Sequence, residues 1–126
     1  MRAVDTNVLV RLVTRDDVRQ TAAAEAFVAA GAWVPMLALA EASWVLTAVY
    51  GLKASGIATA VDMMLNHKDL TLQDPEVIAS ALLRFKKRPA LGFSDCLMLE
   101  IARKAGHLPL GTFDRGLAAL EGAVRI

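Results

Sequence analysis

Cysteine and histidine are scarce in this chain. The single Cys96 excludes an internal disulfide, and with only His67 and His107 beside it a zinc site of the usual kind cannot form. We interpret Cys96 as a packing residue, because cysteine is small and usually buried. Any bound metal must therefore be held by oxygen ligands, which points to Mg²⁺ or Mn²⁺.

Long uncharged apolar runs are missing as well. No such stretch reaches the roughly 18 residues that a transmembrane helix requires. The first residues, MRAVDTN, include an acid and contain no apolar run suited to a signal peptide. These absences predict a cytoplasmic protein without a membrane partner.

A large excess of charge of either sign is also absent. The net charge is +1, which neither demands nor excludes a nucleic-acid partner. Hydrophobic residues are abundant instead, at 56% of the 126 residues. This composition predicts one domain over residues 1–126, whose apolar excess serves the core, a homo-oligomer face or a partner groove.

Short apolar strands alternate with helices along the chain. Strands are predicted at about residues 2–4, 32–34, 70–72, 108–110 and 124–126. Helices are predicted at about residues 7–13, 19–30, 36–50, 55–65, 75–87, 93–105 and 115–120. This alternation indicates an α/β fold with a parallel sheet covered on both faces, and a functional site beyond the carboxyl ends of its strands.

Glu41 is the only charged residue between Met36 and Gly51. Hydrophobic residues cover nearly every face of the helix predicted there, so we expect the helix, including Trp44, to be largely buried. An unpaired carboxylate in such a place would shift its pKa or destabilise the fold. Glu41 therefore needs a partner, which is either an arginine in a buried salt bridge or a metal ion. The arginines considered for that salt bridge are Arg11 and Arg2.

Three further acids stand alone in apolar or tight-turn sequence. Asp5 ends the first predicted strand, and Asp114 follows the fourth. Both have a simpler interpretation as helix caps, and Asp95 has one as a partner of a helix dipole. The remaining acids are interpreted as solvated or capping charges. If the four isolated acids converge, their repulsion calls for one or two divalent ions, which would also activate water and stabilise charge on a phosphate.

Four segments carry a resemblance to a known family: VDTNVLVRLV, ALAEASWVL, LGFSDCLMLEIA and PLGTFDRGL. They resemble the PIN-domain ribonucleases, in the expected order over nearly the whole chain, and most closely the VapC-type toxins of toxin–antitoxin pairs. The resemblance implies a three-layer α/β/α sandwich with a central, mostly parallel sheet of four to five strands. It also implies a Mg²⁺- or Mn²⁺-dependent endoribonuclease, a hydrolase that leaves 5′-phosphate and 3′-hydroxyl ends.

The acidic site of the family, carried over residue by residue, maps to Asp5, Glu41, Asp95 and Asp114. Asp5 and Asp95 are expected to hold the metal directly. Glu41 would bind directly or through water, and Asp114 would serve a second ion or a water. The polar residues that match the neighbourhood of this site, and would orient ligands or water, are Asn7, Thr112 and Ser94.

Contact with RNA is predicted from basic and aromatic residues. The segment RFKKRP places four positive charges in five residues, which serve either a helix dipole and solubility or an RNA backbone. The candidate cations are Arg11, Arg15, Arg84, Lys86, Lys87, Arg88 and Arg115. The aromatic residues that could stack on bases are Trp33, Trp44, Phe93 and Phe113, of which Trp44 is expected in the core.

The family resemblance also implies protein partners. Relatives usually form homodimers and carry a groove for the cognate antitoxin. We expect the antitoxin at the helices predicted over residues 19–30, 36–50 and 55–65, with a basic side chain inserted toward the acids.

Two other classes of protein are considered. A receiver-like or phosphotransfer domain also places aspartate at a strand end, but the dehalogenase-type motif needs a second aspartate where Asn7 stands, and no lysine follows in a fitting context. A catalytically silent PIN-like module that binds RNA or protein is the other alternative. Retention of all four acids argues against it.

Overall fold

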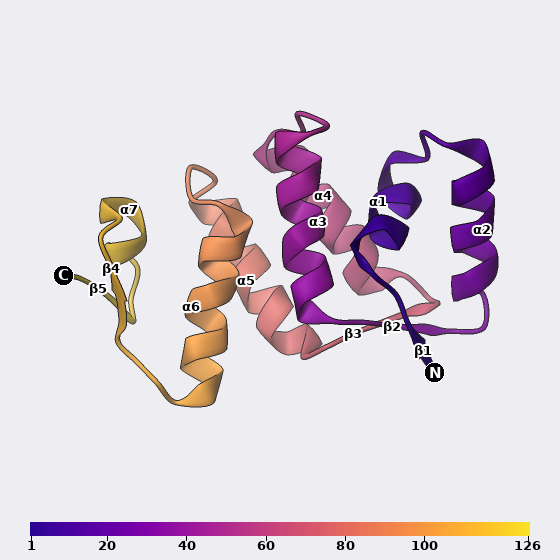
Figure 1. Ribbon diagram of the computed structural model, residues 1–126. Coiled ribbons are helices and arrows are strands. Elements are labelled where there is room, and N and C mark those ends of the chain that lie inside the picture. Colours follow the sequence, from indigo (N-terminus) through magenta and orange to yellow (C-terminus); the bar gives the residue numbers. More distant parts are fainter. The chain divides into compact units, whose positions relative to one another are not determined.

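Two compact units, Met1–Pro75 and Glu76–Ile126, make up the chain in the computed structural model, which describes all 126 residues. Both units combine helices with short parallel strands (Figure 1). No helix has both the length and the apolar character needed to cross a membrane.

The first unit contains a three-stranded parallel sheet in the order β1-β2-β3, formed by Arg2–Ala3, Ala32–Val34 and Leu70–Leu72. In register, Ala3 lies opposite Trp33, and Trp33 lies opposite Thr71. Val34 and Leu72 are buried, whereas Trp33 and Thr71 are exposed, so the sheet buries one face within this unit. Figure 1 shows the helices of the unit on one side of these strands. The prediction that both faces are covered is therefore not met within the unit.

The helices of the first unit are α1 (Thr6–Thr14), α2 (Val18–Val28), α3 (Met36–Ala48) and α4 (Ala54–Asn66). Helix α1 packs against α2 and α3, α3 also contacts α4, and α4 contacts β3. Fully buried Leu9, Leu39 and Leu46 hold this core together.

Helix α3 is less buried than predicted. Leu37 and Trp44 are 71% and 67% exposed, and Glu41 lies exposed between them on the same face. The helix was expected to be buried on nearly every face because apolar residues surround it. Its neighbours in this unit cover only the side that carries Leu39, Ala42 and Leu46, so the prediction that Trp44 lies in the core is wrong.

The second unit contains α5 (Pro75–Lys87), α6 (Phe93–Ala105), β4 (Leu110–Thr112), α7 (Arg115–Ala118) and β5 (Ala123–Arg125). Strands β4 and β5 are parallel, and Leu110 lies opposite Ala123. The rings of Phe85 and Phe93 meet edge to face with centroids 5.9 Å apart, which joins α5 to α6.

All predicted helices and strands are present, with small shifts at their ends. Helices α2, α3 and α7 end two residues earlier than predicted, and β4 both begins and ends two residues later. Leu110 N donates to Gly122 O at 2.8 Å, whereas Pro109 has no N–H to offer to the ladder. The parallel α/β class is confirmed, and the strands form one sheet of three and one of two. The continuous sheet of four to five strands in a sandwich stays a prediction.

Candidate active site

Asp5 follows the carboxyl end of β1 and caps α1. Its Oδ1 accepts a hydrogen bond from Val8 N at 3.2 Å, so the capping interpretation is confirmed. Oδ2 accepts no hydrogen bond from the protein. The side chain is exposed, so one oxygen fixes its orientation and the other is available to a ligand.

Glu41 has a partner that the sequence analysis missed. Thr6 Oγ1 donates to Glu41 Oε2 at 2.7 Å. The expected salt bridge is absent, because the Arg11 guanidinium binds Asp16, and that of Arg2 lies 3.8 Å from the ring centroid of Phe27. The interpretation of Glu41 as a buried ion pair is therefore wrong.

The sequence contains an indication that Thr6 supports the site. Thr6 is the middle residue of the D-T-N opening, where a hydroxyl beside a candidate metal ligand suits a supporting role. Asn7, the third residue of that motif, makes no hydrogen bond to the acids and lines a groove instead. Its role in orienting ligands stays a prediction.

Asp95 lies half-buried in the first turn of α6, where the positive end of the helix dipole favours a carboxylate. No protein group donates a hydrogen bond to it. A Cβ added at Gly92 would lie 3.8 Å from Asp95 Oδ2 and 3.9 Å from Ser94 Oγ. The glycine therefore leaves room beside both side chains.

Asp114 follows the carboxyl end of β4 and caps α7, with Oδ1 accepting from Leu117 N at 2.9 Å. Thr112 Oγ1 accepts from Asp114 N at 3.0 Å and so helps to place the acid. A Cβ at Gly116 would lie 3.2 Å from Asp114 Oδ1, closer than side chains normally approach. The turn is therefore shaped around this carboxylate.

The four acids divide equally between the units, with Asp5 and Glu41 in the first and Asp95 and Asp114 in the second. Within either unit, no group of three or more histidine, cysteine or acidic side chains forms a metal site. Each of the four carboxylates nevertheless keeps at least one oxygen without a hydrogen bond to the protein. Such hard oxygen donors fit Mg²⁺ or Mn²⁺.

Cys96 is fully buried in α6. Burial raises the pKa of its thiol, and the neighbouring Asp95 raises it further. The packing interpretation is confirmed, because a buried thiol with a raised pKa is a poor nucleophile.

The predicted RNA-contact residues fall into two groups. Arg11 donates to Gln20 Oε1 at 2.5 Å, to Tyr50 Oη at 2.9 Å and to Asp16. Arg15 and Arg84 are ion-paired with acidic residues. The exposed cations without a partner in the protein are Lys86, Lys87, Arg88 and Arg115.

Three of the four candidate stacking residues are accessible, since Trp44 is exposed on α3 as described above. Phe113 is 78% exposed and immediately precedes Asp114, and Trp33 is 36% exposed. Phe93 is buried and cannot stack on a base, because its ring packs on Phe85.

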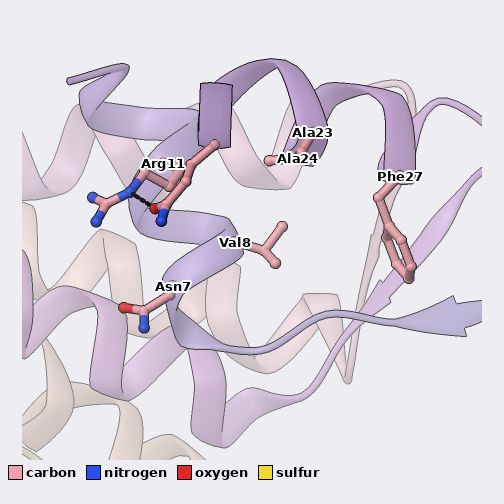
Figure 2. Close-up of a pocket in the computed structure, with 7 residues that line it drawn as sticks. Asn7, Val8, Arg11, Ala23, Ala24 and Phe27 are labelled. Carbon is pink, nitrogen blue, oxygen red and sulfur yellow. Dashed lines mark hydrogen bonds between the residues drawn. The ribbon is translucent and has the colours of Figure 1, made fainter. Parts of the chain in front are cut away.

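A groove of about 370 Å³ lies between α1 and α2. It is lined by Asn7, Val8, Arg11, Gln20, Ala23, Ala24 and Phe27. Figure 2 shows Asn7 and Phe27 on separate parts of this groove, with Val8 between them and Arg11 bound to a neighbouring side chain. Most of the lining is apolar, as expected for a groove that holds a peptide.

The comparisons with known proteins agree with this arrangement at the level of a family. The family model of the PIN domain matches residues 2–123. No curated protein and no solved structure matches the chain.

Proposed function

The chain belongs to the PIN-domain family, and we propose on that premise that it is a metal-dependent endoribonuclease and the toxin of a toxin–antitoxin pair. PIN domains are generally nucleases and typically use divalent ions such as Mg²⁺. The observation that carries the proposal is the placement of Asp5 and Asp114. Each lies two residues beyond the carboxyl end of a parallel strand, and each keeps one carboxylate oxygen for a ligand.

The metal would be held by the carboxylates of Asp5 and Asp95, with Glu41 and Asp114 completing the set. When bound, it would supply Lewis-acid activation of water and neutralise charge on the scissile phosphate. The chain contributes orientation: Thr6 holds Glu41, and the N-terminal N–H groups of α1 and α7 hold Asp5 and Asp114. This proposal requires all four carboxylates to share one site in the sandwich expected for the family.

The RNA would be positioned by groups close to these acids in the sequence. Phe113, exposed beside Asp114, would stack on a base, and Arg115 would contact a phosphate. Lys86 and Arg88, both exposed, would add backbone contacts that weaken as salt is raised.

The antitoxin would occupy the groove between α1 and α2, which shares only α2 with the three helices expected for it from the sequence. Its apolar wall, with Val8 and Phe27, suits a peptide, and Asn7 in its lining is only two residues from Asp5. A bound peptide could therefore reach the acids with a basic side chain. A cytoplasmic homodimer completes the proposal.

The test is cleavage of structured RNA by the purified chain and by Asp5→Asn, each with Mg²⁺, with Mn²⁺ and with EDTA. Asp69→Asn, which removes a carboxylate that makes no hydrogen bond, is the matched control. We expect cleavage only by the wild type and the control, and only with metal. Cleavage by Asp5→Asn, or cleavage in EDTA, would contradict the mechanism.

The same assay separates the alternatives. Intact RNA under every metal condition, with RNA or peptide binding retained, would indicate a silent binding module. An acyl-phosphate on Asp5 after incubation with a small phosphodonor would indicate a phosphotransfer domain.

A further inference from the structure

A second hollow, between α5 and α6, lies wholly within the second unit and has a volume of about 350 Å³. It is lined by Ser80, Leu83, Arg84, Lys87, Glu100 and Arg103. The α5 residues among them recur every three or four positions, so they share one face of that helix. Helix α6 supplies the remaining two.

Glu100 binds two of the cations of this hollow. It is buried, so the interpretation of this acid as a solvated or capping charge is wrong. Its side chain is 6% exposed, and both oxygens are bound, Oε1 by Arg84 Nε and Oε2 by Arg103 Nε at 3.1 Å. A buried carboxylate is tolerated only with such partners. One acid cannot balance two guanidiniums and Lys87, so the lining keeps a net charge of +2, three cations less one anion.

Several hydrogen-bond donors in the hollow remain without a protein partner. Arg84 uses Nε for Glu100, and its two terminal nitrogens bind nothing in the protein. Arg103 uses Nε and also gives Nη2 to Glu121 O at 2.6 Å, which leaves Nη1. The Lys87 ammonium and the Ser80 hydroxyl are exposed and have no partner. Guanidinium, ammonium and hydroxyl donors that face one hollow suit the oxygens of a phosphate group.

We propose that this α5–α6 hollow binds a backbone phosphate of an RNA strand, at a nucleotide other than the one cut. The choice of RNA rests on the proposed ribonuclease function. A contrast within the chain favours a polyanion over a peptide here. The α1–α2 groove has four apolar residues among its seven, whereas Leu83 is the single apolar residue among six in this hollow.

The test measures RNA binding without cleavage, by fluorescence anisotropy of a labelled single-stranded RNA in EDTA. Arg84→Ala would strip Glu100 of a partner and could unfold the unit, so the exposed Lys87→Ala is the informative variant. We expect it to weaken binding about fivefold and to lower the slope of log affinity against log salt by about 1. Lys53→Ala, which removes an exposed charge of the first unit, is the control and should bind as the wild type does.

Equal losses in Lys87→Ala and Lys53→Ala would overturn the proposal, and so would wild-type affinity in Lys87→Ala. Displacement of the RNA by a low concentration of a polyglutamate peptide, with the peptide's affinity dependent on Lys87, would assign the hollow to a protein partner instead. If RNA binding depends on Lys87 but the chain cuts no RNA, the ribonuclease proposal is refuted and the proposed phosphate site is not. If the chain cuts RNA but binding does not depend on Lys87, only the proposed phosphate site is refuted.

Discussion

Thr6 Oγ1 lies 2.7 Å from Glu41 Oε2, and this hydrogen bond ties the first turn of α1 to the middle of α3. Both groups lie on the outside of the unit, Thr6 in part and Glu41 fully, so the bond contributes little to stability compared with the buried leucines around it. The hydrogen bond instead fixes the orientation of the Glu41 carboxylate. Glu41 presents its other oxygen in a fixed direction, as a supporting partner does for a metal ligand.

Replacement of Thr6 by valine should therefore separate function from folding. Thr6→Val keeps the shape of the side chain and removes the donor, so Mg²⁺-dependent cleavage should fall at least about tenfold at limiting Mg²⁺. The free energy of unfolding should change by less than about 1 kcal/mol. Thr6→Ser retains the hydroxyl and should keep most of the activity. A valine variant with the metal dependence of the wild type would show that the bond has no catalytic consequence.

Asp5 has two roles that a pair of variants can separate. Asparagine caps a helix about as well as aspartate, whereas alanine cannot accept the bond from Val8 N. Asp5→Asn should keep the free energy of unfolding and lose cleavage. Asp5→Ala should lose cleavage and also about 1 kcal/mol of stability, measured by urea unfolding. Similar stability of the two variants would mean that the cap does not contribute to the free energy of unfolding.

Asp16 should make stability depend on pH in the acid range. The Thr14 hydroxyl, first, and the Tyr50 hydroxyl hold the pKa of this carboxyl below its ordinary value of 3.8. A lowered folded-state pKa stabilises the fold above the unfolded value, and the contribution disappears as pH falls through the folded value. The difference in free energy of unfolding between wild type and Asp16→Asn should be constant near neutral pH and shrink below about pH 4. A difference that grew on acidification would contradict this assignment.

Cys96 should be chemically silent in the native protein. It is fully buried, and burial raises the pKa of its thiol. Ellman's reagent should react with it only after unfolding in denaturant. Cys96→Ala should lose about 1 kcal/mol of stability through the space it leaves and retain cleavage. Rapid labelling of the folded chain, or loss of cleavage without loss of folding, would revive a catalytic role for the thiol.

The parts that sequence predicts well are those decided locally. The start of α5 at Pro75 was predicted correctly, because proline favours the first turn of a helix and Glu76 partners the helix dipole within the same turn. Asp5 and Asp114 were placed correctly at strand ends by the same kind of reasoning. The start of β4 was wrong by two residues, since it depends on a bond to Gly122.

The parts that sequence predicts poorly depend on which elements become neighbours. An apolar residue on every face of α3 suggested complete burial, yet Trp44 is exposed, because composition does not say how many helices pack around another. The partner of Glu41 lies 35 positions away, and Arg11 was a reasonable candidate until Asp16 and Tyr50 proved to bind it. Distant pairs of exposed polar groups leave no periodic trace in a sequence.

The proposed metal site makes a prediction about the stability of the chain. An ion held by both Asp5 and Asp95 should stabilise the folded chain through mass action. At about 100 times its dissociation constant, Mg²⁺ should raise the free energy of unfolding by about 2.7 kcal/mol. Asp5→Asn and Asp95→Asn should each abolish most of that gain, and the double variant should lose no more than either, because residues of one site are not additive.

Without Mg²⁺ both variants should be as stable as the wild type or slightly more stable, since a repelling charge is gone. Thermal unfolding with Mg²⁺ or with NaCl of equal ionic strength measures these differences and removes general screening. If each single variant lost an independent half of the effect, Asp5 and Asp95 would instead hold two separate ions.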